Sequence, residues 1–472
     1  MSQPFPAHPF FSGNYAPLSF EADAPDLVLR GELPKGLAGT LYRNGPNPQF
    51  APRDSNHHWF IGDGMIHAFH IADGRVSYRN RWVRTPKWEL EHEAHRALFG
   101  SWGNPATTDP SVQGKNNGAA NTNIVWHAGK LFALYEAQRP FALDPETLAA
   151  QGYWDFGGAF TGTRFTAHPK IDPETGEMVF FAYSATGPFT RTLSYGVIDK
   201  TGKLARFDHF DAPYASMIHD FMVTRNYVLF PVLPLTGSMQ RAMSGKPAYA
   251  WEPSKRAYVG VMKRNADVSS VRWFECDPCY VFHPMNAYED GDKIVGDVMQ
   301  YDAAPLFPDA DGRPGDPAKA VASLTRWTFD LTANTNGFKR EPIDDLAGEF
   351  PRFDERLAGL DYRHGFFAAS SDRLFTDHFD TLAHVDLKTN KRSTYKLPKG
   401  DAVSEPIFVP RSSESRDGDG YLLATIYRGA ENRSDLAVFD TVALEHGPIA
   451  ITELSHRVPF GFHGNWQPAA PR

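Results

Sequence analysis

Cysteine is almost absent from the 472 residues of this chain, and so are long apolar runs and any excess of basic residues. The two cysteines, Cys276 and Cys279, form a Cys-Asp-Pro-Cys segment without the second half of a zinc site, so we interpret them as two reduced thiols. The most apolar stretch, residues 228–235, is too short for a bilayer and holds two prolines. A net charge of −8 offers no basic face for phosphate backbones. These features argue against a disulfide scaffold, a membrane span and nucleic-acid binding.

The N-terminal segment lacks a positive leading region followed by an apolar core, which excludes a secretory signal by pattern and predicts a cytoplasmic location. Peripheral contact with lipid and oligomerisation stay open. No low-complexity linker interrupts the sequence, so we predict a single domain over residues 1–472.

An all-β fold is indicated by 39 glycines, 37 prolines and 13% aromatic residues. Short apolar runs end repeatedly in aspartate before a turn and a second run, which is typical of hairpins. The aspartates are Asp73, Asp144, Asp199, Asp330, Asp386 and Asp440. Hairpins over this length favour a β-propeller, although the pattern alone leaves a barrel or sandwich open. We expect the aperiodic segments 86–120, 236–256 and 301–322 to cover one face as binding loops.

Four of the 18 histidines share a context that the others lack. Each joins the end of an apolar or small run to a turn-forming or polar residue, which predicts an imidazole at the tip of a strand. They are His168, His219, His283 and His463. The spacing of the first three, about one propeller blade each, is compatible with a shared metal site, but from the residues alone a buried histidine satisfied by its neighbours is the commoner situation.

Several segments along the whole chain resemble motifs of the carotenoid cleavage oxygenases, and within that family those of the bacterial lignostilbene dioxygenases. They are Leu-Tyr-Arg-Asn-Gly-Pro-Asn-Pro (41–48), Phe-Ile-Gly-Asp-Gly-Met (60–65), Asn-Thr-Asn (121–123), the segment 167–177, the three later histidine segments and Glu-Pro-Ile-Phe-Val-Pro (405–410). The resemblance implies a seven-bladed β-propeller with iron(II), Fe(2+), on its axis and a dome of loops and helices over the active-site face.

Carried over by motif, the resemblance implies that His168, His219, His283 and His463 are the iron ligands. It also implies that three glutamates hold the outer nitrogens of these rings: Glu136, Glu349 and Glu405. Thr122 matches a threonine whose methyl group crowds an open coordination position, and Phe60 matches a phenylalanine that packs on stilbene substrates.

The chemistry that the resemblance implies is oxidative scission of a carbon–carbon double bond, in which both atoms of O2 enter two carbonyl products. The partners would be an apolar conjugated alkene and O2. At the two positions where lignostilbene dioxygenases hold a phenol with lysine and tyrosine, this chain has Tyr135 and Trp102. These replacements argue against a classical 4-hydroxystilbene preference, although Tyr135 could still donate a neutral hydrogen bond. A stilbenoid or lignin-derived substrate is our prediction from the resemblance, with an apocarotenoid as the alternative that the replacements favour. A catalytically silent propeller that acts as a binding scaffold is the non-enzymatic alternative.

Overall fold

Short antiparallel strands make up most of the structure, a computed structural model that describes residues 3–53, 57–101, 105–372 and 379–470. The chain divides into two compact units. Unit 1 combines the residues up to Asp155 with those from Leu397 onward, and unit 2 runs from Phe156 to Lys396. Whether the two units form one domain over residues 1–472 depends on how they are joined, so the single domain stays a prediction.

Unit 1 holds three sheets. The first has the order β1 (Ala22–Ala24), β5 (Arg75–Trp82), β4 (Gly64–Ala72), β3 (Gly39–Pro46) and β33 (Gly464–Pro468). The second runs through β6 (Asn123–His127), β7 (Lys130–Leu134), β8 (Phe141–Leu143) and β9 (Ala150–Tyr153). The third has the order β2 (Val28–Gly31), β32 (Pro448–Glu453), β31 (Arg433–Asp440), β30 (Gly420–Arg428) and β28 (Ala402–Val403), and β29 (Ile407–Pro410) also pairs with β30.

Unit 2 holds four four-stranded sheets, each in chain order. The first two are β10 (Lys170–Ile171), β11 (Met178–Ala182), β12 (Thr192–Ile198) and β13 (Leu204–Asp211), then β14 (Met222–Val223), β15 (Tyr227–Val232), β18 (Ala257–Lys263) and β19 (Arg272–Cys276). The other two are β20 (Tyr280–Asp290), β21 (Lys293–Tyr301), β22 (Ser323–Asp330) and β23 (Lys339–Pro342), then β24 (Ala347–Phe353), β25 (His364–Ser370), β26 (Thr381–Asp386) and β27 (Lys391–Lys396). A small pair, β16 (Leu235–Gly237) and β17 (Tyr249–Trp251), stands apart.

The predicted aspartate turns are present, and each closes a hairpin between neighbouring strands. Asp199, Asp330, Asp386 and Asp440 each accept a hydrogen bond from the backbone N–H two residues further on, at 2.8–3.2 Å. Asp144 does the same at 3.1 Å. This short bond stabilises a tight turn without help from the strands. At Asp73 and Gly74 both φ angles are positive, 50° and 73°, as a two-residue hairpin turn requires.

Burial explains why the strands differ in composition. Every residue of β11 is buried, and six of the seven residues of β12 are, so both faces of these strands are apolar. The outer strands β13 and β27 instead alternate between partly buried and exposed residues. Continuous apolar runs therefore mark strands covered on both faces, and alternating runs mark strands with one face in water.

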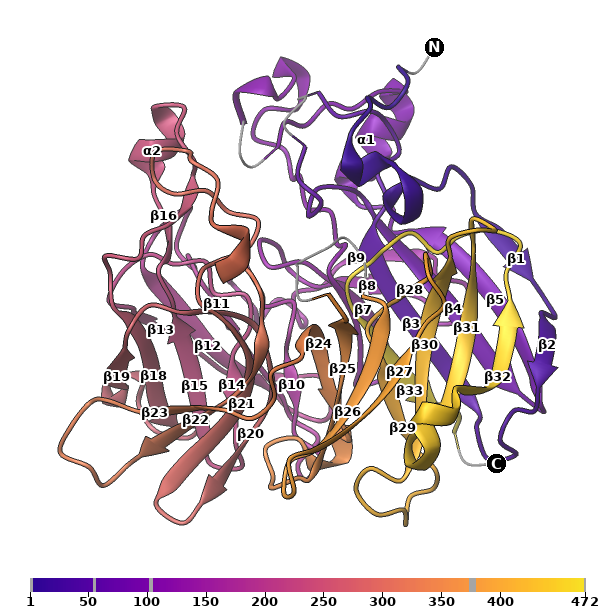
Figure 1. Ribbon diagram of the computed structural model, residues 1–472. Helices are drawn as coiled ribbons and strands as arrows, with labels where there is room; N and C mark the ends of the chain where they lie inside the picture. Colours follow the sequence, from indigo (N-terminus) through magenta and orange to yellow (C-terminus); the bar gives the residue numbers. More distant parts are fainter. Residues whose placement is uncertain (1–2, 54–56, 102–104, 373–378, 471–472) are drawn as a thin grey trace. The chain divides into compact units, whose positions relative to one another are not determined.

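Helices are few and lie outside the sheets. The α-helices are α1 (Pro86–Ala94) and α2 (Met239–Met243), and the short 3-10 helices are η1 (Pro9–Phe11), η2 (Gly13–Tyr15), η3 (Pro105–Thr107), η4 (Pro110–Val112), η5 (Val268–Ser270), η6 (Pro317–Lys319), η7 (Glu355–Leu357) and η8 (Thr441–His446). Helix α1 begins where Thr85 accepts from the N–H of Trp88 at 3.2 Å, and it ends at His95, whose φ is 50°. In Figure 1, α1 lies beyond the strand ends of unit 1, and α2 lies beyond those of unit 2. Among the described residues, no helix has the length and apolar character of a membrane span.

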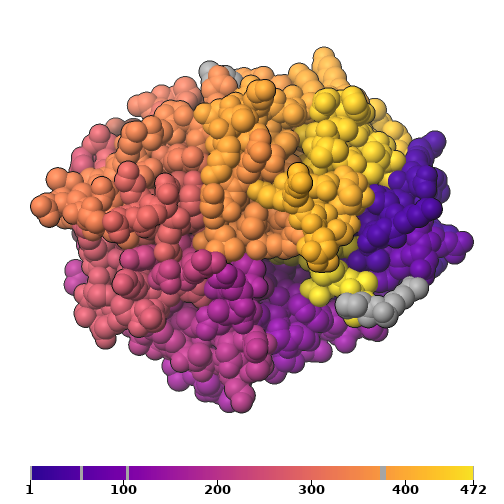
Figure 2. Space-filling view, turned by 90° about the horizontal axis from the view of Figure 1, so that it is seen from below, coloured from indigo at the N-terminus to yellow at the C-terminus, as the bar shows by residue number. Residues whose placement is uncertain are grey.

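Strands from the N-terminal and C-terminal parts of the chain pair with each other in unit 1. Strand β33 pairs with β3, with Arg43 opposite Gly464, and β2 pairs with β32. Figure 2 shows this closure at the surface, where indigo N-terminal residues lie beside yellow C-terminal ones. The pairing brings the predicted ligand His463 next to the 41–48 motif.

Candidate metal centre

Most of the predicted site residues lie on, or a few residues before, an edge strand of a sheet. An edge strand pairs on one side only, so the chain at or just before its start can leave the regular ladder. The pairs of residue and strand are Thr122 and β6, His168 and β10, His219 and β14, His283 and β20, Glu349 and β24, Glu405 and β29, and His463 and β33. The same placement, on or just before an edge strand, recurs in seven sheets. The repeated sheets therefore supply the predicted site residues from distant parts of the sequence.

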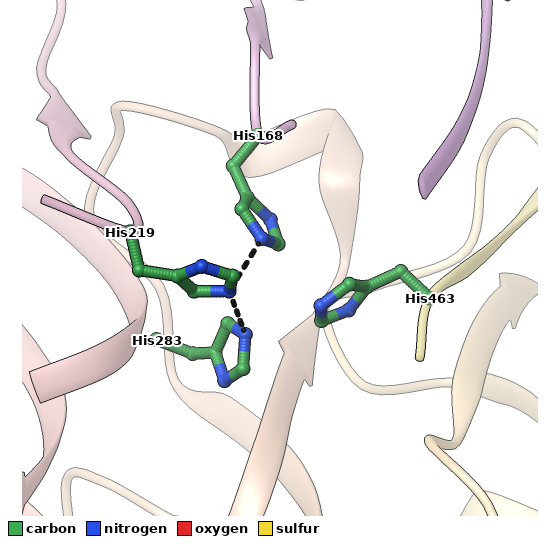
Figure 3. Close-up of side chains that lie close together, drawn as sticks. All are labelled: His168, His219, His283 and His463. Atoms are coloured by element: carbon green, nitrogen blue, oxygen red, sulfur yellow. Dashed lines mark hydrogen bonds between the residues drawn. The ribbon is translucent and has the colours of Figure 1, made fainter. Parts of the chain in front are cut away.

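Three of the four predicted ligands belong to unit 2, and they point toward one another. The Nε2 atom of His219 lies 3.0 Å from that of His168 and 3.0 Å from that of His283. Figure 3 shows these three rings, with dashed lines joining the close nitrogens. All three side chains are buried, with at most 9% of each residue exposed.

The 3.0 Å separations test whether these nitrogens could hold a metal ion. The Nδ1 atom of His283 faces a carboxylate and so carries that ring's proton, which leaves a lone pair on its Nε2. This lone pair faces Nε2 of His219, which in turn faces Nε2 of His168, so these buried nitrogens need a cation or shared protons between them. Nitrogens bound at about 2.1 Å and at right angles lie about 3.0 Å apart, whereas tetrahedral ligands lie about 3.4 Å apart. The spacing fits a metal with ligands at right angles, and such a shell leaves further positions open.

Glu349 holds the outer nitrogen of His283. Its Oε2 atom lies 2.5 Å from Nδ1 of His283 and accepts the backbone N–H of Phe350 at 2.6 Å. Its Oε1 atom accepts the hydroxyl of Tyr301 at 3.1 Å. The carboxylate is buried, and β-bulges follow Glu349 in β24 and flank His283 in β20, which turn both side chains out of the regular pleat. This arrangement fixes the tautomer of His283 and aims its Nε2 inward.

Tyr301 was not singled out by its sequence, yet its hydroxyl is one of three donors to the Glu349 carboxylate. Burial, and next the neighbouring Glu349, raise the pKa of Tyr301 well above its usual value, so the hydroxyl keeps its proton.

We expect Tyr301→Phe to lower the free energy of unfolding by about 1.5–3 kcal/mol, because it removes a hydrogen bond to a buried charge. Urea unfolding of the metal-free protein measures this. Tyr258→Phe is the matched control, since that hydroxyl has no hydrogen bond to the described residues. Equal stability of the two variants would contradict the expectation.

The outer nitrogen of His168 faces a different group. Its Nδ1 atom lies 3.9 Å from Oδ2 of Asp220, which is too far for a hydrogen bond. Asp220 is buried and pairs with Lys170, whose Nζ lies 2.8 Å from Oδ1. Asp220 was not among the predicted residues, although a carboxylate directly after His219 in an apolar run was a usable signal.

His463, the fourth predicted ligand, belongs to unit 1 and has its own buried partner. Its Nδ1 atom lies 2.9 Å from Oε1 of Glu405, whose Oε2 accepts the N–H of Gly464 at 2.8 Å. The backbone N–H of His463 donates to the carbonyl of Thr122 at 3.3 Å. All three side chains are buried. The chain therefore builds the same imidazole–carboxylate pair twice, once in each unit, and it places Thr122 beside the histidine of unit 1.

The remaining predicted residues are in unit 1. Phe60 is half-buried, and its ring lies 5.6 Å from that of Phe462, the residue before His463. Tyr135 and Glu136 follow strand β7 and are half-buried. Trp102 lies outside the described residues.

The backbone carbonyl of Tyr135 accepts the N–H of Gln138 at 3.2 Å, and Gln138 belongs to a group of polar side chains. The hydroxyl of Tyr153 donates to Asn116 at 3.1 Å, and Asn116 donates to Gln138 at 3.0 Å. Burial, and next Tyr135, raise the pKa of Tyr153.

Comparison with known proteins agrees with this geometry. The family model described as retinal pigment epithelial membrane protein matches residues 15–468. The chain is 40% identical to isoeugenol monooxygenase of Pseudomonas putida, over 97% of this chain and 98% of that protein. It is 38% identical to lignostilbene-alpha,beta-dioxygenase isozyme III of Sphingomonas paucimobilis, over 99% and 98%. A crystal structure of Pseudomonas brassicacearum lignostilbene dioxygenase matches with a TM-score of 0.95 at 38% identity, over 99% of this chain and 100% of the other.

The chain belongs to this family, which is the carotenoid cleavage oxygenase family that the sequence motifs predicted. Its seven sheets of four or more strands, counted among the described residues, and the likeness to the solved dioxygenase confirm a seven-bladed β-propeller. As a member of an oxygenase family the protein is an enzyme, and three of its histidines, His168, His219 and His283, form a buried group that fits a metal site.

Proposed function

We propose that this protein uses iron(II) and O2 to cleave the double bond of a conjugated aromatic alkene into two aldehydes. The proposal rests on three buried imidazoles, in which Nε2 of His219 lies 3.0 Å from Nε2 of His168 and 3.0 Å from Nε2 of His283. Glu349 fixes the tautomer of the His283 ring. We propose His463 as the fourth ligand, because its ring is held by Glu405 in the way that His283 is held by Glu349. Glu136 is proposed to hold His219.

Iron is the proposed metal because imidazole suits iron(II) and because relatives of the chain are oxygenases. When bound, iron would supply the binding and activation of O2. The residues of the chain supply orientation. Glu349 and Glu405 accept the Nδ1 protons and keep each Nε2 lone pair directed at the metal. Thr122 is proposed to narrow one open position with its methyl group.

Aromatic residues beside His463 are proposed to hold the substrate. The ring of the half-buried Phe60 contacts the ring of Phe462. The Trp59 ring stacks on the Phe460 ring, with 5.0 Å between the ring centroids and an interplanar angle of 17°. A rigid aromatic surface of this kind binds a flat conjugated alkene without losing much side-chain freedom. Tyr135, with polar neighbours, is proposed to receive the phenol end of the substrate.

The compared proteins favour a small alkenyl phenol over an apocarotenoid. Relatives that share 38–41% identity with the chain over its full length are named for isoeugenol and lignostilbene, both of which carry a phenol conjugated to a double bond. The apocarotenoid oxygenase of Synechocystis, seen as a Glu150Gln mutant, is more distant, with 28% identity over 97% of this chain and 98% of the other and a TM-score of 0.86. We keep the apocarotenoid as the second candidate substrate, because the apocarotenoid oxygenase has the same fold over 97% of this chain.

The test is to load anaerobically purified protein with Fe(II), add isoeugenol, a lignostilbene, resveratrol or an apocarotenal with O2, and identify the aldehydes by mass spectrometry. We expect aldehydes from at least one phenol and none without O2. Metal analysis should find about one iron per chain, as one site requires. Protein that retains no iron, or that leaves all four alkenes intact, would overturn the proposal.

Tyr135→Lys should raise kcat/KM for 4-hydroxystilbenes by about tenfold, because an ammonium stabilises a phenolate by about 1.4 kcal/mol more than a neutral hydroxyl does. The measurement is a comparison of 4-hydroxystilbene with 4-methoxystilbene, which cannot ionise. The gain should be confined to the phenol. If both substrates respond equally, position 135 does not recognise the phenol.

A further inference from the structure

Arg43, in the 41–48 motif, is a buried arginine for which the proposed chemistry has so far no role. It lies in β3 and is 2% exposed. Its guanidinium reaches two segments that are far apart in sequence: Nη2 donates to the carbonyl of Phe462 at 3.0 Å, and Nη1 donates to the carbonyl of Glu405 at 3.2 Å. One planar group therefore binds the residue before the histidine and the glutamate that holds its ring.

The neighbouring residue reinforces this contact. The N–H of Asn44 donates to the carbonyl of His463 at 2.8 Å, and the carbonyl of Asn44 accepts the N–H of Phe462 at 3.0 Å. The Asn44 side chain donates to the carbonyls of Ala120 and Asn123, on either side of Thr122, at 2.9 and 2.8 Å. Together the two residues fix the backbone on both sides of His463.

Charge gives a second reason for an arginine here. Nη1 of Arg43 lies 3.9 Å from Oε2 of Glu405, a carboxylate that is 2% exposed. A buried carboxylate is costly unless a cation or several donors compensate it. Glu349, its counterpart in unit 2, is bound by neutral groups of the described residues: a phenol, a backbone N–H and an imidazole. The two carboxylates that face imidazoles therefore differ in their electrostatic surroundings.

We propose that Arg43 is a positioning residue for the metal centre: through Glu405 and the Phe462 carbonyl it sets the direction of the His463 ring. The inference rests on the proposed function, since it takes His463 as a ligand. A lysine could not replace the arginine, because a single ammonium cannot span two carbonyls with the parallel N–H groups of a planar fork.

The test is Arg43→Lys, which keeps the charge and removes the fork. We expect the variant to release Fe(II) to a chelator about tenfold faster than the wild type, at the low end for the loss of an outer partner of a metal ligand. The visible absorption of the Co(II)-loaded protein should shift as well, because it reports the geometry of the ligands. Neither readout depends on turnover.

Arg428→Lys is the matched control in the same unit. Arg428 binds the buried Asp435 at 2.6 Å and Asp401 at 2.8 Å, and neither carboxylate belongs to the proposed centre. It should lower stability without changing metal release or the cobalt spectrum. If Arg43→Lys and Arg428→Lys both leave release and spectrum as in the wild type, Arg43 is only structural and the proposal is overturned.

Coupling to Glu405 is tested by adding Arg43→Lys to Glu405→Gln. The effect of the arginine on release should shrink to within about twofold in that background, because the two residues act in one network. An undiminished effect would overturn a role through Glu405. If Arg43→Lys does not fold, Arg43→Gln, whose amide reaches one carbonyl, takes its place with the same readouts. A wild type that binds Co(II) but cleaves no alkene would overturn the proposed function while leaving the metal-release comparison valid.

Discussion

His283→Ala should leave the purified protein without bound iron and without alkene-cleaving activity. The Nε2 atom of His283 lies 3.0 Å from that of His219, and its ring connects the group of nitrogens to Glu349. The substitution removes a ligand and leaves the Glu349 carboxylate buried without its imidazole partner. We expect iron content and turnover to fall below about a tenth of the wild-type values, because metal affinity depends on the full set of deprotonated ligands.

The measurements are metal analysis after anaerobic purification and aldehyde formation under saturating Fe(II). His384→Ala is the control, since His384 is a partly buried histidine of the same unit whose ring contacts His364 and Phe366. That variant should keep its iron. A His283→Ala protein with wild-type iron content and rate would remove His283 from the centre, and loss of iron in both variants would point to misfolding.

Each of the seven large sheets has a hairpin at the equivalent place, and the sequence predicted six of these seven hairpins, because in those six an aspartate directly ends an apolar run. The seventh was missed for a physical reason. Strand β18 ends at Lys263, and the aspartate comes four residues later, at Asp267. There it accepts the N–H of Ser269 at 2.8 Å and caps the short helix η5, as Asp440 caps η8. The residue type is the same, but Asp267 does not directly follow the apolar run, so the sequence lacks the pattern that marks the other hairpins.

The four histidines could be proposed as ligands from the sequence because each combines an uncommon residue type with a place at, or a few residues from, the start of a strand. Their supporting residues could not. Tyr301 ends β21 and Arg43 lies within β3, and both are surrounded by residues typical of any buried strand. Only the pairing of strands reveals that Tyr301 lies opposite Tyr280, three residues from His283, and that Arg43 lies opposite Gly464. Long-range register decides these contacts, and the sequence pattern of a single strand does not contain it.

Glu349→Gln should reduce kcat/KM by about ten- to a hundredfold while iron still binds. The three groups that bind the Glu349 carboxylate explain why a glutamine side chain, which has nearly the same shape, can take its place. Its Oε2 accepts from His283 and from the backbone of Phe350, and a glutamine carbonyl at that place accepts from both. The glutamine amide would then face Tyr301, whose hydroxyl can turn from donor to acceptor. The side chain fits its pocket, and what changes is the negative charge behind the His283 ring.

Loss of that charge makes His283 a weaker electron donor, so the effect should fall on the rate more than on the amount of metal bound. The measurements are iron content, the rate of Fe(II) release to a chelator, and kcat and KM for an alkenyl phenol. The double variant Glu349→Gln with Tyr301→Phe separates charge from geometry, because phenylalanine leaves the glutamine amide without an acceptor. We expect it to lose iron as well as rate. Unchanged kinetics in Glu349→Gln would mean that the carboxylate does not tune the ligand, and its contact with His283 would then serve folding alone.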